Sequence, residues 1–486
     1  MTVINFRLKI SDQRNRQSYP LAQDIDQLKM QFESDRGRII NSAAIRRLQQ
    51  KTQVFPLEKN AAVRSRLTHS MEVQQVGRFI VQTIFKTLSS EQQKNYGLTG
   101  LERSMESLVE MACLMHDIGN PPFGHFGEQA INQWFEQHLP QLVKEASDPQ
   151  SPELFSSNPA LMRDILQFEG NAQAIRLVHS LLNLNLTFSQ AAAILKYTRL
   201  ATEPKPNTGY LQKKVGYYFS EKAYIEKLAA NLSMQIGARH PLSYIMEAAD
   251  DISYCLADIE DAVEKGLINL DQLSKLLANT FTEQVNAFEL GSALAKDMQH
   301  WTEKAKKYPD QYFISLRVSL THPLVTHAAG QFIENIEAIY HGQLDSALLE
   351  DRSYAHAITE TLKKVAREHV FCHPEVEKLE LQGYRIISGL LDCYRPLLAM
   401  DHQTFNAVLT KQKSAPLIEK HLAKKLPNKH LSCYQQAIDA LALETTDNEH
   451  FANLEFYYRC RLLQDYISGM TDQFAYDEYR NLMVID

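Results

Sequence analysis

The stretch LMHDIGNPPFGHFGE, residues 114–128, decides the fold and the chemistry that we expect of this chain. The apolar run SLVEMACLMHD, residues 107–117, predicts a helix that ends on a His-Asp pair. Pro121 and Pro122 cannot continue that helix, because proline lacks an amide proton and its ring clashes with the preceding turn. We therefore expect two helices joined by a tight break, with polar side chains on both sides of it.

The polar side chains beside this break have two interpretations each. The imidazole of His116 and the carboxylate of Asp117 suit a divalent cation such as Zn, Mn, Fe or Mg, although an isolated His-Asp pair is more often structural. If a second helix starts at residue 123 or 124, Glu128 lies one turn after His125, where it would raise the pKa of the ring and fix its tautomer. Such a pair can act as a general acid or base, but by itself it is more often a surface ion pair.

A third histidine lies upstream, in RSRLTHSMEV at residues 64–73. Apolar spacing predicts an amphipathic helix there, in which Arg66 lies one turn before His69 and on the same face. A histidine beside an arginine is poorly explained as part of an apolar core. We therefore group His69 with the polar residues of the Pro-Pro break.

The sequence PLSYIMEAADDISYCLADIEDAVEKG, residues 241–266, predicts one long helix that begins at Pro241 and ends at Gly266. The face opposite its apolar stripe is acidic, and because like charges four residues apart repel, this face requires either water or a cation. A tyrosine between two aspartates offers a flat surface between hydrogen-bond acceptors, a combination that suits a sugar. The acidic face consists of Glu247, Asp250, Tyr254, Asp258 and Asp261.

The composition is that of an ordinary globular protein, since 44% of the 486 residues are hydrophobic and 22% are charged. A net charge of −7 argues against a protein that mainly coats nucleic acid, so an anionic ligand needs a local basic site. No apolar run approaches the roughly 18 residues that span a bilayer. The six cysteines lie far apart, without a CxxC pair. We expect buried thiols, a cytoplasmic location and no membrane partner.

Helical spacing of apolar residues dominates the chain, so we predict an all-α fold. We expect two regions, residues 1–266 and residues 267–486, within one continuous structure. Residues 202–218 predict a long exposed loop, either a solvated connector or a loop that faces a ligand. Residues 383–400 and 456–470 predict apolar helices that belong to the core or to a subunit interface.

Together these motifs resemble the HD superfamily of metal-dependent phosphohydrolases, whose pattern H…HD…D is matched by His69, His116-Asp117 and one aspartate of the pair at 250 and 251. The segments HDIGNPPFGHFGE, FEGNAQAIR, LKYTR and EAADDISYCLADIEDAV are similar in particular to bacterial deoxyguanosinetriphosphate triphosphohydrolases. The similarity resumes in HPEVEKLELQGYRIISGLL and YYRCRLLQDYISGMTD. It therefore covers most of the chain.

The resemblance implies an HD-type helical fold with additional C-terminal helices. Residues 1–266 would contain the catalytic core, and residues 267–486 would complete a base pocket and an oligomer interface. The implied reaction is hydrolysis of dGTP to deoxyguanosine and intact triphosphate, by attack of water at the α-phosphorus with a divalent metal ion, Mn or Mg. A homo-oligomer, specifically a hexamer, and single-stranded DNA as an allosteric activator are also implied.

By the same resemblance, the metal ligands would be His69, His116, Asp117 and Asp250. Asp250 fits the family motif better than Asp251, which points about 100° away around the helix. Arg66 would act at the α-phosphate, and His125, held by Glu128, would be the general acid or base.

The implied substrate contacts fall into three groups. Tyr254 beneath the sugar would leave no room for a 2′-hydroxyl group, while Gln53 and Asp258 would bind the 3′-hydroxyl. The triphosphate contacts would be Asn171, Lys196, Tyr197 and Lys214, and the guanine contacts Val54, Phe371 and Glu380.

Two other functions fit the same motifs. One is a triphosphohydrolase of broader dNTP specificity or a nucleoside monophosphate hydrolase, and the other is a regulatory protein that binds nucleotide or single-stranded DNA without turnover. The lysines and tyrosine of the triphosphate group argue against a monophosphatase, and the intact ligands and His-Glu pair argue against an inactive site. The basic residue expected opposite the guanine is not identified, because residues 420–430 contain lysines and histidines where arginines are expected.

Overall fold

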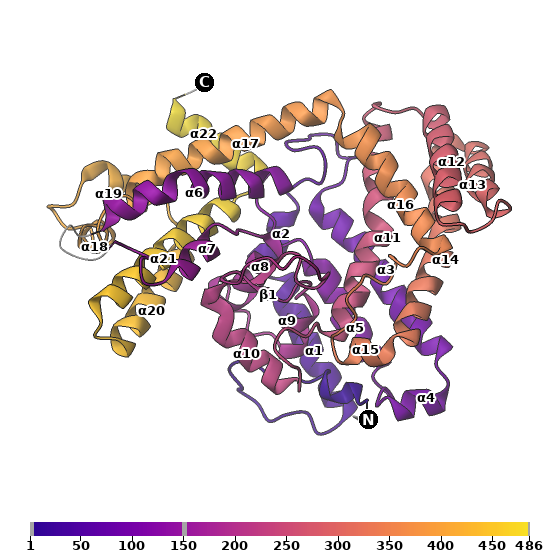
Figure 1. Cartoon of the computed structure of the whole chain (residues 1–486), viewed down its shortest axis with the longest axis horizontal. Helices are drawn as coiled ribbons and strands as arrows, with labels where there is room; N and C mark the ends of the chain where they lie inside the picture. Colours follow the sequence, from indigo (N-terminus) through magenta and orange to yellow (C-terminus); the bar gives the residue numbers. More distant parts are fainter. Residues whose placement is uncertain (1–3, 148–152, 485–486) are drawn as a thin grey trace.

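The structure, a computed structural model, describes residues 4–147 and 153–484 and is almost entirely α-helical (Figure 1). The all-α prediction is confirmed. The α-helices of the described residues are α1 (Ile25–Ile40), α2 (Ala43–Leu48), α3 (Arg66–Thr87), α4 (Ser90–Asn95), α5 (Glu102–Met115), α6 (Gly124–Ala146), α7 (Pro159–Ile165), α8 (Gly170–Arg176), α9 (Phe188–Ala193), α10 (Lys222–Asn231), α11 (Pro241–Glu264), α12 (Leu270–Ala287), α13 (Asp297–Lys306), α14 (Tyr312–Glu334), α15 (Ile336–Tyr340), α16 (Tyr354–Ala366), α17 (Pro374–Tyr394), α18 (His402–Leu409), α19 (Leu417–Ala423), α20 (Asn428–Glu444), α21 (Asn448–Ser468) and α22 (Asp472–Met483).

The Pro-Pro break forms as the sequence predicts. Helix α5 ends at Met115, and α6 begins at Gly124. Phe123 adopts a left-handed backbone conformation with φ of 61°, which is uncommon for a bulky residue. Gly127 is required one turn later, because a Cβ atom there would lie 2.0 Å from the carbonyl oxygen of Pro122. The break is therefore a tight turn that requires glycine at position 127.

Helices α3, α5 and α11 pack against one another within the larger of two hydrophobic clusters. Helix α3 starts with a capping box, in which the side chains of Ser65 and Thr68 accept hydrogen bonds from each other's backbone amide groups. Gly77 lies at the contact with the other two helices, where a Cβ atom would lie 2.7 Å from Cys113 Sγ and 3.5 Å from the Cβ atom of Ala249. A larger residue would separate the three helices.

The second hydrophobic cluster joins α6 and α17 to the C-terminal helices α21 and α22, on the left of Figure 1. The predicted apolar helices at 383–400 and 456–470 correspond to α17 and α21, with Leu390, Tyr457 and Leu463 buried in this cluster. These side chains belong to the core. The boundary at residue 266 stays a prediction, since the first cluster continues to Val376.

The prediction of a long exposed loop at residues 202–218 is wrong for its second half. Strand β2 (Val215–Tyr217) pairs in parallel with strand β1 (Arg199–Leu200), and both strands are buried. The aromatic rings of Tyr217 and Tyr218 are buried with them. The exposed part of this segment lies mainly at residues 203–209.

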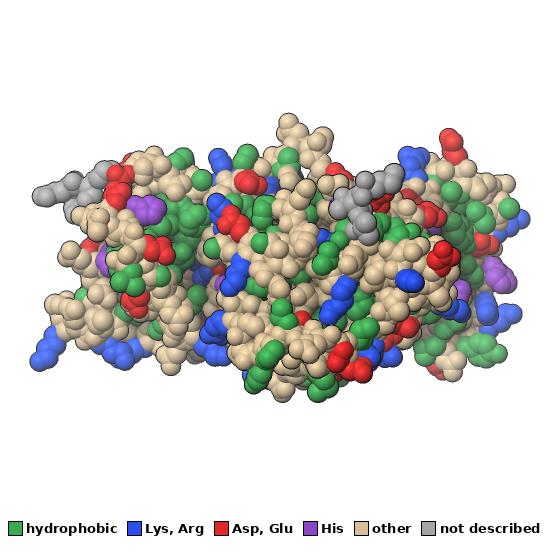
Figure 2. Space-filling view, turned by 90° about the horizontal axis from the view of Figure 1, so that it is seen from below, with side chains coloured by type: hydrophobic (Ala, Val, Ile, Leu, Met, Phe, Trp, Pro, Cys, Tyr) green, Lys and Arg blue, Asp and Glu red, His purple; other side chains and the backbone are tan. Residues whose placement is uncertain are grey.

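The surface shows acidic and basic side chains interspersed over the face in Figure 2. Within the described ranges, no helix is both long and apolar enough to cross a membrane. The prediction of buried thiols is confirmed for Cys113, Cys255 and Cys460, but it is wrong for Cys372, which is exposed. Cys393 and Cys433 are half-buried.

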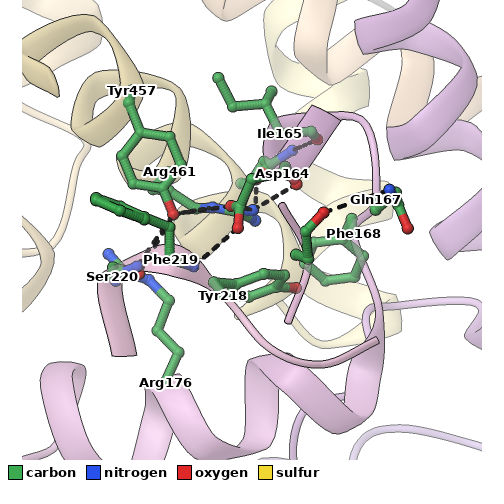
Figure 3. A network of polar contacts seen from close by, with 12 residues as sticks. Asp164, Ile165, Gln167, Phe168, Arg176, Tyr218, Phe219, Ser220, Tyr457 and Arg461 are labelled. Carbon is green, nitrogen blue, oxygen red and sulfur yellow. Dashed lines mark hydrogen bonds and ion pairs between the residues drawn. The ribbon is translucent and has the colours of Figure 1, made fainter. Parts of the chain in front are cut away.

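A buried polar network fastens α21 to α7 and to the 3₁₀ turn η3 (Phe219–Glu221) (Figure 3). Arg461 of α21 forms an ion pair with Asp164 of α7 and also donates to its backbone carbonyl, at 2.6 Å. The Asp164 carboxylate accepts further hydrogen bonds from the Tyr457 hydroxyl and the Phe219 amide, each at 2.8 Å. Both charged side chains are fully buried.

The same network reaches the loop before α8. The Arg461 guanidinium lies 3.5 Å from the centre of the Tyr218 ring, and the Tyr218 hydroxyl donates to the carbonyl of Glu169 at 3.1 Å. Helix α21 therefore acts through Tyr218 on the backbone of Glu169.

We expect Arg461→Met to lower the free energy of unfolding by about 3–5 kcal/mol, because it leaves the buried Asp164 carboxylate without its cation. Urea denaturation followed by circular dichroism measures this change. The control is Arg367→Met, which removes an exposed arginine from a loose surface ion pair and should change the free energy by no more than about 0.5 kcal/mol. Equal effects of the two substitutions would contradict the prediction.

Candidate active site

Two histidines and one aspartate converge where α3, α5 and α11 meet. One ligand atom from each of His69, His116 and Asp250 lies within 4.8 Å of the others. The Nε2 atoms of His69 and His116 lie 3.3 Å and 3.5 Å from the same Asp250 oxygen. The other ring nitrogen of His116 donates to the Cys113 carbonyl at 2.7 Å, which fixes the ring with Nε2 toward the cluster. This donor set suits a divalent metal ion.

Asp117 lies beside this cluster but is bonded elsewhere. Its carboxylate pairs with Arg66 at 2.5 Å and accepts a hydrogen bond from the side-chain amide of Asn120 at 2.6 Å. The carboxylate also lies 3.7 Å from His116 Nε2. Burial alone would raise the pKa of Asp117, but the charges of His116 and Arg66 lower it to about 2. The carboxylate is therefore ionised at neutral pH and within reach of the cluster.

The two aspartates at positions 250 and 251 have different environments. The pKa of Asp250 is lowered by the two histidines, against the opposing effect of burial. Asp251 points away and lies 3.3 Å from Lys363 Nζ of α16. This geometry agrees with the choice of Asp250 over Asp251.

His125 and Glu128 form a hydrogen-bonded pair at the start of α6. His125 Nδ1 and Glu128 Oε2 lie 3.0 Å apart, and the other Glu128 oxygen accepts from the Gly170 amide at 2.8 Å. Glu128 is buried, whereas 75% of the His125 side chain is exposed. The hydrogen bond from Glu128 is the main cause of a raised pKa of His125. An ionised carboxylate thus favours the protonated form of an accessible ring.

Two acidic residues that were not predicted as site residues hold the predicted triphosphate contacts. Glu169 accepts from the Asn171 amide at 2.8 Å and lies 3.3 Å from Lys214 Nζ. Glu247 of α11 lies 3.4 Å from Lys196 Nζ. It is also bonded to the Tyr210 hydroxyl and to Arg239, at 2.5 Å and 2.7 Å.

On the acidic face of α11, Glu247, Asp258 and Asp261 are buried and Asp250 and Tyr254 are half-buried, so the face is not solvated. Glu247 and Asp261 are paired with cations, as with Asp261 and Arg64 at 2.6 Å, whereas Asp250 faces the two histidines. The two Asp258 oxygens are buried and have no hydrogen-bond partner among the described residues. Burial and the charges of Asp261 and Asp250 raise the pKa of Asp258 well above its usual value. Asp258 is therefore a buried polar group that no described residue satisfies.

Among the predicted sugar and base contacts, Phe371 lies beside Tyr254. The Tyr254 ring centroid lies 6.2 Å from that of His69 and 6.4 Å from that of Phe371. The side-chain amide of Gln53 is buried without a hydrogen-bond partner in the described chain. Val54 packs against the larger hydrophobic cluster. Burial and Glu377 raise the pKa of the half-buried Glu380 to about 7.

Lys51 and Asp472 tie the Pro-Pro break to the C-terminal helices. Lys51 Nζ donates to the carbonyls of Asn120 and Ser468, the latter at 3.0 Å. Asp472, at the start of α22, accepts from the amide of Phe123 and the amide of Thr52, each at 3.0 Å. Neither residue was predicted as a site residue, although Asp472 ends the quoted segment YYRCRLLQDYISGMTD, because their partners here include backbone groups. Together they hold the left-handed Phe123 and the segment that precedes α3.

The comparisons with known proteins agree with this geometry. The HD domain family matches residues 66–187. A protein described as a probable deoxyguanosinetriphosphate triphosphohydrolase from Pseudomonas aeruginosa is 52% identical over 99% of each chain. Deoxyguanosinetriphosphate triphosphohydrolases from Enterobacter sp. and Yersinia pestis are each 49% identical over the full length of both chains.

The fold and the converging histidines and aspartate thus define an enzyme with an HD phosphohydrolase domain. Within that class, the chain belongs to the deoxyguanosinetriphosphate triphosphohydrolase family. The resemblance noted in the sequence is confirmed.

We expect Asp472→Ala to increase amide hydrogen exchange at Thr52 and Phe123 by roughly tenfold or more, because each amide loses a hydrogen bond to a carboxylate. Hydrogen–deuterium exchange with peptide mass spectrometry measures the change. The matched control is Asp477→Ala, which removes an exposed aspartate from the same helix. Exchange that is unchanged at both amides would show that Asp472 does not hold the turn.

Proposed function

We propose that this protein hydrolyses dGTP to deoxyguanosine and inorganic triphosphate. The observation that carries the proposal is the single face of α11, on which Asp250 joins the two histidines while Tyr254 and the unpartnered Asp258 follow at successive turns. A phosphate group bound near Asp250 would thus place the adjoining sugar near Tyr254 and Asp258. The names of the full-length relatives support the substrate.

The proposed metal ligands are His69, His116, Asp117 and Asp250, with Mn²⁺ or Mg²⁺ as the ion. When bound, such an ion offsets charge on an α-phosphate oxygen and lowers the pKa of a coordinated water. Asp117 would bind the metal through its carboxylate, which in this structure pairs with Arg66 and lies near His116. Arg66 would then direct its guanidinium to the α-phosphate, where it stabilises added negative charge.

His125 is proposed as the general acid. At neutral pH the 5′-oxygen of deoxyguanosine leaves as an alkoxide unless a proton reaches it. The ionised Glu128 favours the protonated ring of His125, and the exposed Nε2 atom can deliver that proton. Glu128 is a positioning residue, since its second oxygen is held by the Gly170 amide.

The triphosphate group would bind Asn171, Lys196, Tyr197 and Lys214. Glu169 and Glu247 hold the two lysine ammonium groups in place, each within 3.4 Å. Nearby Glu247 raises the pKa of Lys196 in spite of its burial, so this lysine stays charged. The ammonium groups are thereby oriented before the substrate arrives.

The nucleoside would lie along Tyr254, with Gln53 and Asp258 on its 3′-hydroxyl group. The Asp258 oxygens and the Gln53 Nε2 atom are buried without a partner among the described residues, so a hydroxyl that donates to Asp258 and accepts from Gln53 would satisfy both. Tyr254 beneath the sugar would exclude a 2′-hydroxyl. The guanine would meet Val54 and Phe371, with Glu380 accepting from its N1–H and exocyclic amine.

The hexamer and the activation by single-stranded DNA are carried by the resemblance alone. The cytoplasmic location is carried by the spacing of the cysteines and by the lack of a long apolar run, and all three stay predictions.

Incubation of the purified protein with dGTP and Mn²⁺, followed by anion-exchange separation of the products, tests the proposed reaction. Deoxyguanosine and triphosphate should form, GTP should not react, and His125→Ala should reduce the rate roughly 10²–10⁴-fold. His138→Ala, on the same helix but outside the site, should keep the rate. Orthophosphate or pyrophosphate as product contradicts the proposal. Equal rates with all dNTPs indicate the broader hydrolase, and binding without turnover indicates the regulatory protein.

We expect Asp250→Asn to abolish stoichiometric Mn²⁺ binding, because it removes the carboxylate that faces both histidines. Isothermal titration of the chelator-treated protein measures the stoichiometry. Asp251→Asn is the matched control, since it removes the same charge one residue away and should leave one site per chain. Equal loss in both variants would contradict the assigned ligand set.

The pH dependence of kcat/KM tests the role of His125. A general acid is active while protonated, so the rate falls as pH rises through the raised pKa of His125. Glu128→Gln removes the carboxylate that raises this pKa, so the alkaline fall should begin at lower pH. An alkaline limb that does not move in Glu128→Gln would rule out His125 as the titrating acid.

A further inference from the structure

A pocket of about 350 Å³ lies away from the residues of the candidate active site, between α2, the start of α20 and the connection from α21 to α22. Its basic lining residues are Arg47, Lys425 and His430, and no carboxylate of the described residues lines it. The pocket therefore offers basic side chains to a ligand, in a chain whose net charge is −7.

His430 is the most constrained of these residues. Its side chain is only 5% exposed, and neither ring nitrogen has a hydrogen-bond partner among the described residues. Burial lowers the pKa of His430, and the charge of Asp465 offsets this only in part. A neutral ring that is buried with an unused donor and an unused acceptor is unfavourable unless another group completes it.

Arg47 carries a positive charge that no described carboxylate neutralises. The half-buried guanidinium forms no ion pair with a described carboxylate, and its pKa is lowered by burial and by the neighbouring Arg46. Arg47 and His430 approach the same point of the chain, since the guanidinium and the ring lie 3.3 Å and 3.7 Å from a Cβ atom built on Gly469. Lys425 differs, because Glu478 neutralises it at 2.9 Å.

The rest of the pocket is apolar or uncharged. Phe474 lies at its edge with 49% of its surface exposed, and Met470 lines the same wall. Gln50 and Thr471 add side chains that can donate hydrogen bonds. The lining thus combines a group that can bind an anion with apolar side chains that can contact a flat or apolar body.

We propose that this pocket binds a small phosphate-bearing anion, whose phosphate group is held by Arg47 and His430. The guanidinium can donate two parallel hydrogen bonds to phosphate oxygens, and the His430 ring can donate a third. Inorganic phosphate and a phosphomonoester with an aromatic body share this chemistry. The pocket volume admits either one.

The pocket is connected to the candidate active site through the backbone. Gly469, Met470 and Thr471 line it, and they are flanked by Ser468, which accepts from Lys51, and by Asp472, which caps the Phe123 amide. A ligand on one side of this three-residue connection therefore adjoins the contacts that hold the Pro-Pro break on the other side.

Equilibrium dialysis of radiolabelled orthophosphate against the full-length, chelator-treated protein tests the proposal. Arg47→Met should bind one phosphate fewer per chain, or bind it roughly tenfold or more weakly, because a charged hydrogen-bond donor is lost. Arg46→Met is the control, since it removes the same charge from the adjacent, exposed residue. His430→Phe should act like Arg47→Met, and thermal unfolding shows whether it folds.

Phosphate that binds at the active-site lysines contributes equally to every variant. The test is therefore the difference in bound phosphate per chain between Arg47→Met and Arg46→Met. Displacement of the Arg47-dependent phosphate by AMP, measured in the same cell, would identify a phosphomonoester with an aromatic body. Retention of phosphate in the presence of AMP would identify the inorganic anion. Identical binding by wild type, Arg46→Met and Arg47→Met would overturn the proposal, whether or not the protein hydrolyses dGTP.

Discussion

The structure depends on one electrostatic constraint, the burial of several carboxylates along a single face of α11. A buried charge is costly unless a partner neutralises it, so each of these residues must attract a cation or a metal from another part of the chain. Glu247 pairs with Arg239 and Lys196, and Asp261 pairs with Arg64. A third carboxylate lies between the histidines of α3 and α5. The segments that approach α11 are therefore selected by charge, and the candidate active site lies where they meet.

Asp258 is the exception that gives this face its proposed specificity. Its oxygens are buried with no partner in the described chain. The pKa of the Asp258 carboxyl group is raised because ionisation is unfavourable in this buried, acidic environment. A hydroxyl group from a ligand would remove that cost, whereas an apolar group would not. The same α11 face thus combines carboxylates that have partners with one that no described residue satisfies.

The sequence predicted the centre of the site better than its surroundings. The positions of His69 and Asp250 follow from helical periodicity and from the HD pattern, because the chemistry itself requires those side chains. The roles of Lys51 and Asp472 could not be predicted, since they bind backbone groups of segments far away in the chain and no spacing of residues indicates such contacts. The burial of Tyr218 was missed for a related reason, because its partner Arg461 belongs to a helix that follows more than two hundred residues later.

The contact between Asp472 of α22 and the Pro-Pro turn limits how the chain can be separated into independent domains. The segment that matches the HD domain, residues 66–187, contains the two histidines but lacks Asp250, and its Pro-Pro turn is held by Asp472. The HD match therefore does not contain all the residues that build the candidate site. Its Pro-Pro turn is held by a carboxylate 349 positions later in the chain, so a substitution in α22 acts on the same turn as a substitution in the HD match.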